Sequence, residues 1–423
     1  MSLRTFRTEE ISRAIDDSGR RLEDEQISGH NAVSVTLLTG GADRPYAFGM
    51  AAALISHGMV IDVIGNNDLD CPEFHGRPGV AFLNFRGSQD PRAGFAQKAL
   101  RVLLYYARLV RYSLAAKPKI FHILWNNKIE FFDRTLLMLY YKLLRKKIVL
   151  TLHNVNKAKR DCRDTRLNRL TLRIQYRLSD HIFVHTEKMK RELIEEFSEK
   201  EARVTVIPFG INNSVPQTDL DSIGARRWLG IREGERTILF FGNIAPYKGL
   251  EYLVLAFRRF LAQPDYRLIV AGRPKNCDAY WRAILEGMHN DILNRRIILR
   301  ADFIPDEETE IYFKAADVLV LPYTHIYQSG VLLLSYAFGL PAIVTDIGSF
   351  RDEIVEGKTG FLCKPNDPAD LARAIDTYFE SNLFRRLGET RRKIIEYAMS
   401  GYSWDTVAVK TCAVYADLES IHQ

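Results

Sequence analysis

Short apolar runs alternate with glycine turns and helical stretches along the chain, and this alternation constrains the fold more than any other feature. The first cycle has a β-type run at 33–38, a turn at Thr39-Gly40-Gly41, a helical stretch over 46–57 and a second β-type run at 60–64. Strand, helix and strand in this order form a βαβ unit, which requires a parallel sheet. Four later runs in the same half also predict buried strands: 119–124, 147–152, 181–184 and 204–207.

The same alternation restarts after a polar connector at 213–236. Six more runs predict strands: 237–241, 266–270, 297–299, 318–321, 342–344 and 360–362. A chain of 423 residues is also too long for one ordinary domain. We therefore predict an α/β fold with two Rossmann-like domains facing a cleft. The expected parts are a flexible N-terminal arm at 1–30, a first domain at 31–212, a second domain at 213–399, and a helix within 400–423 that returns to the first domain.

Composition and charge narrow the class of protein. The chain is 47% hydrophobic and 26% charged, which is ordinary for a globular protein. It has no run of 18 uncharged apolar residues, its N-terminus does not resemble a signal peptide, and its five cysteines lie far apart, so we expect a cytoplasmic protein with reduced thiols. The net charge of +7 favours nucleotides, phosphorylated lipids, a membrane face or nucleic acid as partners, without choosing among them.

Ligands of open parallel sheets bind at the carboxyl ends of the strands, so the residues there are the first candidates for a site. Gly40 and Gly41 end the first strand, where they would let a ligand approach the backbone or simply form a tight turn. His153 and Asn154 end the fourth strand, where the histidine can donate a hydrogen bond to a sugar hydroxyl or a phosphate. The absence of a GxGxxG motif at the first turn argues against a dinucleotide-dependent dehydrogenase.

Other polar residues of the first half are expected to have structural roles. His122 and His185 lie within or near strands and are interpreted as packing residues. Asp68 and Asp70 form a DxD pattern, but no histidine or carboxylate cluster accompanies them, so a solvated turn is expected and no metal site.

The first strand of the second half leads into a segment that predicts an anion site. Gly242 and Asn243 follow the strand, and Lys248 comes just before the next helix, where its ammonium can reach a bound diphosphate. Arg273 and Lys275 follow the next strand and would either line the same site or face water.

The strongest local signal lies at 318–341, where a buried strand passes through a polar loop into an apolar helix. Gln328 precedes Ser329, Gly330 and Val331 at the expected helix start. Free backbone N–H groups in such a first turn, together with the helix dipole, bind phosphate. An ordinary serine N-cap is the alternative interpretation.

In combination these motifs resemble the retaining glycosyltransferases of family 4, which have the GT-B fold. The similar stretches cover most of residues 204–378 in the family's order: 241–249, 303–305 with 316–318, 329–341, 346–348, 353–355 and 357–360. The first half matches more loosely, through Gly40-Gly41, His57-Gly58 and 206–210. Ser403-Trp404-Asp405 resembles the start of the family's returning helix.

The resemblance implies a nucleotide-sugar donor bound mainly by the second domain, an acceptor that enters from the first, retention of the anomeric configuration, and neither a metal ion nor a cofactor. Lys248 matches the lysine that holds the donor diphosphate, and the stretch from Gln328 to Val331 matches the phosphate cradle. Phe303 and Ile304 match the segment that meets the nucleobase. His153 matches the first-domain histidine near the transferred sugar.

Two departures from the family pattern define a subfamily. The arginine of the usual Gly-Arg pair is replaced by Asn243, so one cation is missing unless Arg273 or Lys275 substitutes. The two family glutamates, eight positions apart, are replaced by Ile326 and Leu334. Leucine cannot accept a hydrogen bond from a ribose hydroxyl, so we expect nucleotide recognition to differ.

A basic segment in the first half suggests a membrane partner. Residues 91–129 contain eight Lys or Arg and no Asp or Glu. On a helical wheel, basic residues including Lys98 and Arg101 lie on one side, and apolar residues including Leu103 and Leu109 lie on the other. Such a helix either lies on an anionic membrane or packs on the sheet with a solvated basic face. We therefore expect a glycan or lipid-linked acceptor and a location at the inner face of the plasma membrane.

Three functions stay open at this point. The first is a glycosyltransferase of cell-surface polysaccharide or glycolipid biosynthesis. The second is a sugar-nucleotide 2-epimerase, which shares the architecture but needs catalytic carboxylates that the sequence does not supply. The third is a nucleotide-sugar-binding scaffold that has lost catalysis with its glutamates. Nucleic-acid binding is not expected, because no aromatic-basic motif or helix-turn-helix is present.

Overall fold

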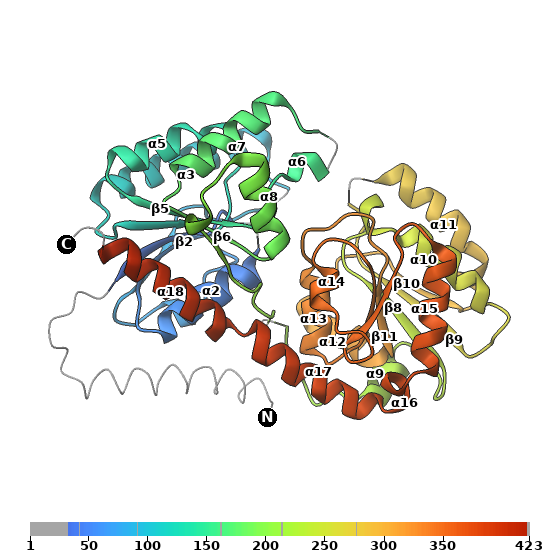
Figure 1. Cartoon of the computed structure of the whole chain (residues 1–423). Coiled ribbons are helices and arrows are strands. Elements are labelled where there is room, and N and C mark those ends of the chain that lie inside the picture. Colours follow the sequence, from blue (N-terminus) through green and yellow to red (C-terminus); the bar gives the residue numbers. More distant parts are fainter. Residues whose placement is uncertain are drawn as a thin grey trace. The chain divides into compact units, whose positions relative to one another are not determined.

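The computed structural model describes residues 33–41, 43–90, 92–160, 163–212, 215–275 and 277–420. The N-terminal arm predicted at 1–30 lies outside these residues. Contacts divide the described chain into an N-terminal unit, 33–210 with 402–420, and a C-terminal unit, 211–401. Each unit is a parallel sheet covered by helices, so the predicted α/β fold with two Rossmann-like domains is confirmed (Figure 1).

The sheet of the N-terminal unit has seven parallel strands in the order β3-β2-β1-β4-β5-β6-β7. Their bounds are β1 Ser34–Leu38, β2 Val60–Gly65, β3 Val80–Asn84, β4 Ile120–Ile123, β5 Lys147–Leu152, β6 His181–Val184 and β7 Val204–Val206. Six of them were predicted, and β3 was missed. β3 is a half-exposed edge strand, so its residues lack the continuous apolar run of a strand that is buried on both faces.

Helices cover both faces of this sheet. They are α2 Arg44–Ser56, α3 Phe95–Ala115, α4 Glu130–Arg134, α5 Leu136–Leu143, α6 Lys157–Arg160, α7 Arg166–Leu178, α8 Glu187–Phe197 and α18 Trp404–Ser420. In Figure 1, α3, α5 and α7 lie together above the sheet, and α2 and α18 lie below it. The core under α2 and α18 joins Val35 and Ile61 of the sheet to Met50 of α2 and Val407 of α18.

The last helix therefore completes the first unit, as predicted. Its Tyr415 is fully buried, and the Tyr415 hydroxyl contacts Nδ1 of His122 in the central strand β4. The other ring nitrogen of His122 lies 2.7 Å from the Thr151 hydroxyl of β5. Burial, with a smaller contribution from His181, lowers the pKa of His122 to about 3, so its ring is neutral and serves packing, as expected.

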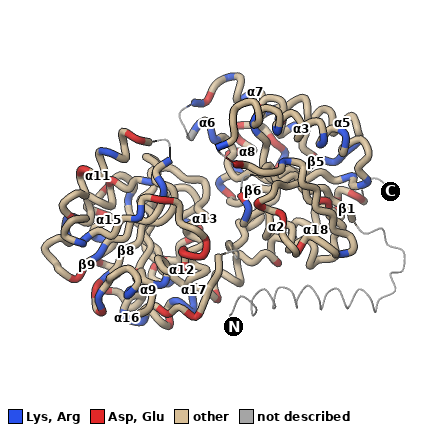
Figure 2. The backbone as a smooth tube through the Cα atoms, turned by 180° about the vertical axis from the view of Figure 1, so that it is seen from behind, with Lys and Arg blue, Asp and Glu red and all other residues tan. Residues whose placement is uncertain are grey.

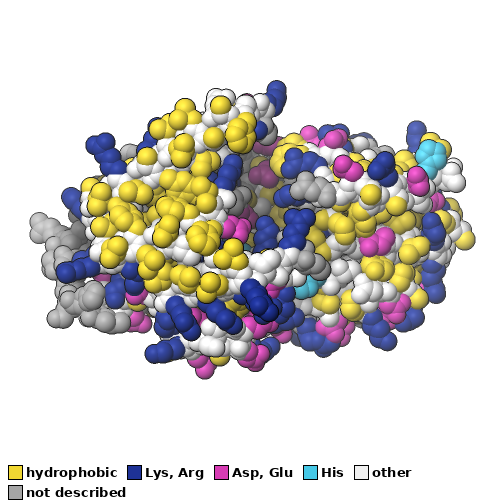
Figure 3. Space-filling view, turned by 90° about the horizontal axis from the view of Figure 1, so that it is seen from above, with side chains coloured by type: hydrophobic (Ala, Val, Ile, Leu, Met, Phe, Trp, Pro, Cys, Tyr) yellow, Lys and Arg dark blue, Asp and Glu magenta, His cyan; other side chains and the backbone are white. Residues whose placement is uncertain are grey.

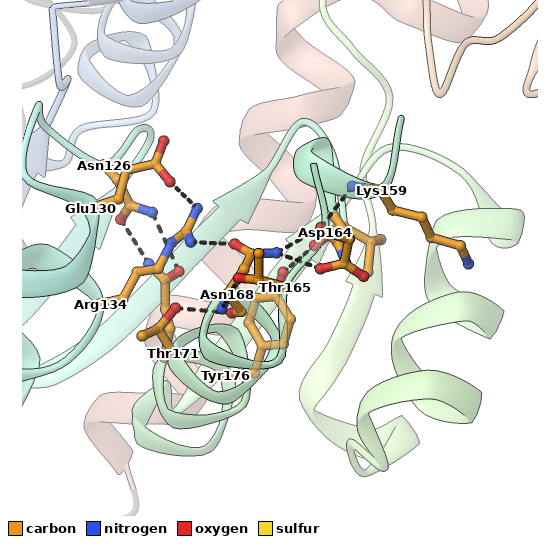
Figure 4. A network of polar contacts seen from close by, with 12 residues as sticks. Asn126, Glu130, Arg134, Lys159, Asp164, Thr165, Asn168, Thr171 and Tyr176 are labelled. Atoms are coloured by element: carbon orange, nitrogen blue, oxygen red, sulfur yellow. Dashed lines mark hydrogen bonds and ion pairs between the residues drawn. The ribbon is translucent and has the colours of Figure 1, made fainter. Parts of the chain in front are cut away.

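A polar network ties α4 to α7 on the upper side of the N-terminal unit (Figure 4). Arg134 pairs with Glu130 at 2.7 Å and donates a hydrogen bond of 2.9 Å to the Asn168 side chain. Asn168 in turn donates to Asp164 at 2.8 Å, and the Thr165 hydroxyl caps α7 by accepting from the Asn168 amide. These contacts hold the short helix α4 against the start of α7.

The sheet of the C-terminal unit has six parallel strands in the order β10-β9-β8-β11-β12-β13. Their bounds are β8 Arg236–Phe241, β9 Tyr266–Ala271, β10 Ile297–Arg300, β11 Val318–Leu321, β12 Ala342–Thr345 and β13 Gly360–Cys363. The chain reverses its direction of winding between β8 and β11, and between β1 and β4 in the other sheet. Such switch points open a crevice at the carboxyl ends of the strands.

Nine α-helices of the described chain belong wholly or mostly to the C-terminal unit: α9 Ser222–Trp228, α10 Leu250–Phe257, α11 Asp278–Leu293, α12 Asp306–Ala315, α13 Gly330–Ala337, α14 Phe350–Glu353, α15 Pro368–Glu380, α16 Asn382–Arg385 and α17 Leu387–Tyr402. Side chains of α10, α11 and α15 pack on the sheet around Phe240 and Leu268. None of the helices in the described ranges is both long and apolar enough to cross a membrane.

Candidate functional site

The switch point of the C-terminal sheet brings together residues that the sequence placed in two separate motifs. Gly242 follows β8 with a φ of 103°, a backbone conformation that favours glycine. A Cβ atom at Gly242 would lie 3.3 Å from Lys248 Nζ and 3.3 Å from Val331 Cγ2. The lysine motif and the start of α13 therefore meet at this glycine.

The Lys248 side chain is held in this crevice by a tight turn. A 3₁₀ turn over Pro246–Lys248 ends at Gly249, whose φ is 63° and where a Cβ would meet the carbonyl oxygen of Pro322 at 2.0 Å. Only glycine fits at that point, so the turn packs directly on the loop that follows β11. Lys248 is only 8% exposed, which excludes an ordinary surface lysine.

Tyr323 is the direct partner of Lys248. The ammonium donates a hydrogen bond of 3.0 Å to the Tyr323 hydroxyl, and Nζ lies 4.9 Å from the centroid of the Tyr323 ring. Burial disfavours the ammonium, but the oxygens of Tyr323 and Tyr247 outweigh this effect and the pKa of Lys248 is raised. Among the described residues no carboxylate forms an ion pair with Lys248. A buried cation without a carboxylate partner favours an anionic ligand.

The structure shows that Ser329 is the N-cap of α13, and phosphate binding at this helix start stays a prediction. Ser329 is buried and caps the helix, because its hydroxyl accepts a hydrogen bond of 3.4 Å from the Leu332 amide. The N–H groups of Gly330 and Val331 lie in the first turn, where an α-helix offers no internal acceptor. The cap thus leaves these two amides without an acceptor inside the helix, and Val331 lies next to Gly242.

Glu353, at the end of α14, lies in one of the stretches that resemble the family, but the sequence assigned no role to it. It is buried, and burial raises the pKa of Glu353 to about 8; the nearby Ser349 and Gln328 side chains lower it again in part without meeting hydrogen-bond geometry. Its Oε2, the Gln328 Oε1 and the Ser349 Oγ are buried without a hydrogen-bond partner among the described atoms. The carboxyl is therefore mostly protonated at neutral pH, close to the residue that precedes the amide cradle.

The remaining predicted donor residues lie at the margin of this crevice. Asn243, Arg273 and Lys275 are exposed, and Ile304 is buried. The Arg273 guanidinium lies 5.9 Å from the centroid of the exposed Phe303 ring. Arg273 is therefore next to the segment expected to meet a nucleobase, and the structure does not bring it into contact with Lys248.

The positions of the missing glutamates are apolar in the structure too. Leu334 is buried within α13. Ile326 packs closely against Gly348, where an added Cβ would lie 2.2 Å from the Ile326 carbonyl oxygen. The neighbouring Ser335 hydroxyl is bound to the Leu332 carbonyl at 2.7 Å. Leu334 has no side-chain oxygen, and the Ser335 hydroxyl already donates its proton within the helix, so neither residue takes the place of the missing glutamate.

The predicted His153 lies in an aromatic cluster of the N-terminal unit. Its ring stacks on Trp125 with centroids 4.0 Å apart, and Tyr46 meets it edge-on at 4.7 Å. Nδ1 of His153 lies 3.1 Å from Nε2 of His185. Sequence reasoning assigned His185 to packing, although its place directly after β6 was a signal for a role beside His153.

The hydrogen bonds of the two histidines define their tautomers. Nδ1 of His185 lies 3.3 Å from the Ile207 carbonyl, which can only accept, so this nitrogen carries the proton. Burial lowers the pKa of His185 to about 4 and places that of His153 well below its usual value, so both rings are neutral. His185 Nε2 then accepts from His153 Nδ1, and His153 Nε2 is buried without a hydrogen-bond partner among the described atoms. The expected hydrogen bond from His153 to a sugar hydroxyl or a phosphate stays a prediction.

The Gly40-Gly41 turn is filled by protein groups. A Cβ at Gly40 would meet Trp125 atoms at 2.6 Å, and one at Gly41 would meet the Arg86 guanidinium at 3.0 Å. The start of α2 already holds a carboxylate, since Asp43 accepts a hydrogen bond of 3.1 Å from the Tyr46 amide. The glycines are therefore required by close packing, and Arg86 is the cation nearest to them. Asn154 follows β5 beside His153 and is half-buried.

Two family models match the chain, one in each half. The model described as Glycosyltransferase Family 4 matches residues 39–215, and the model described as Glycosyl transferases group 1 matches residues 224–400. The D-inositol 3-phosphate glycosyltransferase of Acidothermus cellulolyticus is 26% identical over 245 residues, which are 56% of this chain and 53% of that protein. The chain spans about half to three fifths of the length of the curated relatives it matches.

Solved structures share the fold over almost the whole chain. Sucrose-phosphate synthase from Thermosynechococcus elongatus has a TM-score of 0.71 and 17% identity, with coverage of 92% of this chain and 100% of that chain. The Anabaena protein HepE, solved in complex with UDP-glucose, has a TM-score of 0.69 and 15% identity with the same coverage. At these identities the structural likeness establishes the two-domain fold.

Proposed function

Because the chain belongs to the family 4 glycosyltransferases of the GT-B fold, we propose that it transfers a sugar from a nucleotide-sugar donor to a glycan or lipid-linked acceptor. One observation carries the proposal: Lys248 is a buried cation without a carboxylate partner among the described residues, and it lies beside the open amides of α13. This arrangement fits a diphosphate. The donor diphosphate is proposed to bind there, with Gly242 between the two groups.

Lys248 and the α13 amides would act on the departing diphosphate. Cleavage of the bond between the anomeric carbon and the diphosphate oxygen leaves negative charge on that oxygen. Preorganised donors at such a position stabilise the transition state, which is usually the largest catalytic term. The acceptor oxygen would bond to the anomeric carbon on the same face, and the acceptor proton would move to a donor phosphate oxygen, with retention and without a metal ion.

His153 is proposed to position the sugar. Its Nε2, which has no hydrogen-bond partner among the described atoms, would form a hydrogen bond with a sugar hydroxyl. The stacked Trp125 and the bonded His185 fix the plane of its ring, so the direction of Nε2 is defined. Phe303, Ile304 and Arg273 are proposed for the nucleobase side of the donor, and Gly40, Gly41 and Asn154 for the acceptor side.

A structural neighbour suggests the class of donor, and the surface of the N-terminal unit suggests the class of acceptor. The Anabaena neighbour was solved with UDP-glucose, so uridine donors come first in a screen. The apolar and basic outer helices of the N-terminal unit support a lipid-linked acceptor of cell-surface polysaccharide or glycolipid biosynthesis. We propose a cytoplasmic protein that attaches peripherally to the inner membrane face.

A thermal-shift screen of nucleotide sugars tests the proposal, because the correct ligand stabilises the fold by mass action. The wild-type protein should be stabilised by at least one nucleotide sugar. Lys248→Met should lose that stabilisation, and Lys393→Met, which removes an exposed lysine of the same unit, should keep it. Stabilisation that is equal in the two variants would refute the assignment of the diphosphate to Lys248.

A binding protein without catalysis is the second candidate, favoured by the buried apolar Leu334 where the family has a glutamate. Slow hydrolysis of the stabilising donor, measured as release of the nucleoside diphosphate, separates the two functions. A transferase should release it, and a pure binder should bind the donor without turnover.

A further inference from the structure

The outward face of α3 is apolar, which the sequence prediction did not anticipate. Tyr105, Tyr106 and Leu109 pack inward, as a helix on a sheet requires. Leu103 was grouped with them but is 65% exposed, and Leu100, Leu104 and Leu114 are exposed on the same side. Phe95 at the start of the helix is 88% exposed. The helix therefore buries one apolar stripe and presents another.

Neighbouring helices extend this apolar surface. The exposed large side chains on them are Ile129 and Phe131 near α4, Leu136, Leu139 and Leu143 on α5, and Leu167 and Leu170 on α7. The Tyr140 hydroxyl of α5 donates a hydrogen bond of 2.9 Å to the Val110 carbonyl of α3, so these helices are in contact. Figure 3 views this side from above and shows hydrophobic side chains over most of the face, with Lys and Arg at its margin. We name it the apolar face.

The apolar face carries positive charge in the same helices. α3 contains four Lys or Arg and α7 contains four Arg, and neither helix contains Asp or Glu. Lys and Arg positions recur along α3, α5 and α7 in Figure 2. Exposed leucine and phenylalanine beside basic residues, on helices that do not cross a bilayer, are typical of proteins that lie on an anionic membrane surface.

A basic hollow opens at the edge of the apolar face. Its walls include Arg86, Lys98, Arg101, Tyr105, Asn127 and Lys128. Two exposed apolar side chains lie beside it: Phe95, one helical turn before Lys98 on the same side of α3, and Ile129, which follows Lys128. The hollow lies where β3 and β4 end, which is the ligand-binding edge of the sheet.

Three cations of the hollow, Arg86, Arg101 and Lys128, form no ion pair with a carboxylate of the described residues. Arg86 donates to the Asn127 side chain at 2.9 Å and to the Gly40 carbonyl, and its guanidinium lies 4.8 Å from the Tyr105 ring centroid. Arg101 donates to the carbonyl oxygens of Ser88 and Asp90. The buried Asp133 balances part of the Arg86 charge, and the charges of Arg101 and Lys128 are available to a ligand. Phosphate oxygens match the planar arginine donors.

From this juxtaposition we propose that the hollow binds the phosphate group of a membrane lipid while the apolar face lies in the membrane surface. A lipid source fits better than a soluble phosphate, because the exposed Phe95 and Ile129 beside the hollow would contact the acyl or prenyl chain. The inference deepens the proposed function and rests on it in one respect, since it identifies this lipid phosphate with the acceptor side of the transfer.

Vesicle flotation with the full chain tests the proposal. Phosphatidylcholine vesicles would carry either phosphatidic acid, a phosphomonoester, or phosphatidylglycerol, a phosphodiester, at equal surface charge. The wild type should bind the phosphomonoester vesicles about tenfold more tightly, which corresponds to about 1.4 kcal/mol. The double variant Arg101→Gln, Lys128→Gln should lose this preference. Arg111→Gln, Lys117→Gln removes the same charge outside the hollow and should weaken binding to both vesicles equally.

A second pair of variants tests the apolar face. Leu103→Ser combined with Leu143→Ser should abolish flotation on both vesicle types, and Leu293→Ser, an equally exposed leucine of the C-terminal unit, should not. Melting temperatures confirm that each variant is folded. Stabilisation by soluble glycerol phosphate as strong as that by vesicles would assign the hollow to a water-soluble ligand and overturn the lipid proposal.

The outcomes separate this inference from the proposed function. A preference for phosphomonoester vesicles that survives the hollow variant would refute the inference, whatever the donor screen gives. Failure of every nucleotide sugar to stabilise the wild type would refute the function and leave the vesicle result as independent evidence for a phospholipid site.

Discussion

At the scale of single residues, the site is defined by side chains whose charge state is set by burial. Lys248 keeps its charge because Tyr323 and Tyr247 compensate for desolvation, and Glu353 tends to lose its charge because little compensates. The sequence predicted Lys248 from its place after a strand. It could not predict Tyr323 or Glu353 as partners, because those contacts arise only when β8, β11 and α14 are folded together.

Removing the ammonium should therefore affect turnover more than removing its partner. Lys248→Ala should lower the rate of donor turnover by about 10²-fold or more, the range seen when an oxyanion donor is deleted. Tyr323→Phe keeps the aromatic ring under Nζ and removes only the hydroxyl, so its loss should be smaller. Steady-state kinetics with the donor found in the screen measures both. Near-normal turnover in Lys248→Ala would remove this lysine from the mechanism.

Glu353 gives the chain a pH dependence of stability. Its pKa is about 8 in the folded protein and about 4.3 when unfolded. The unfolded state therefore releases this proton at lower pH, and the free energy of unfolding should fall as pH rises from about 4.3 to 8. Glu353→Gln has no proton to lose and should flatten that part of the profile. Chemical denaturation across this range measures the slope, and identical slopes in the two proteins would contradict the assignment.

At the scale of elements, the sequence predicted the strands that are buried on both faces and the helices that follow them. It missed β3, because an edge strand needs no continuous apolar run. For α3 it predicted a basic side and an apolar side. It did not predict which apolar side chains pack on the sheet and which face solvent, because a helical wheel does not contain that information. Leu103 shows the difference: the sequence grouped it with Leu109, but Leu109 is buried and Leu103 is exposed.

The turn that carries Lys248 should depend on glycine. Gly249→Ala would place a Cβ 2.0 Å from the Pro322 carbonyl at a φ of 63°, so the turn must move away from β11. We expect a loss of about 2 kcal/mol or more of stability, together with loss of donor binding. Gly58→Ala has a similar φ of 72° and open space around it, and it isolates the backbone strain, which costs about 1 kcal/mol. Equal destabilisation by both variants would show that the contact with Pro322 does not matter.

At the scale of the whole molecule, the chain builds its N-terminal unit from both ends of the sequence. The alternation predicted the strands along the chain, and the family resemblance predicted the returning helix. Neither predicted the contact between Tyr415 and His122, since the two residues are nearly 300 positions apart. α18 packs its apolar side against α2 and the sheet, so the N-terminal unit is complete only when the last helix is in place.

Tyr415→Phe should therefore destabilise the N-terminal unit. The change leaves one buried ring nitrogen of His122 without its partner, which costs about 1–3 kcal/mol. Tyr252→Phe, which changes a half-buried tyrosine of α10, is the matched control and should leave the free energy of unfolding almost unchanged. Denaturant unfolding measures both. A stable Tyr415→Phe protein would show that the returning helix is held by apolar packing alone.

The central claim is that a diphosphate binds in the crevice between Gly242, Lys248 and the first turn of α13. The most direct measurement is an experimental structure of the full chain with the nucleoside diphosphate of its stabilising donor. We expect phosphate oxygens about 3 Å from Lys248 Nζ and from the amides of Gly330 and Val331. A diphosphate bound elsewhere, with Lys248 still turned to Tyr323 and the α13 amides facing water, would contradict the account.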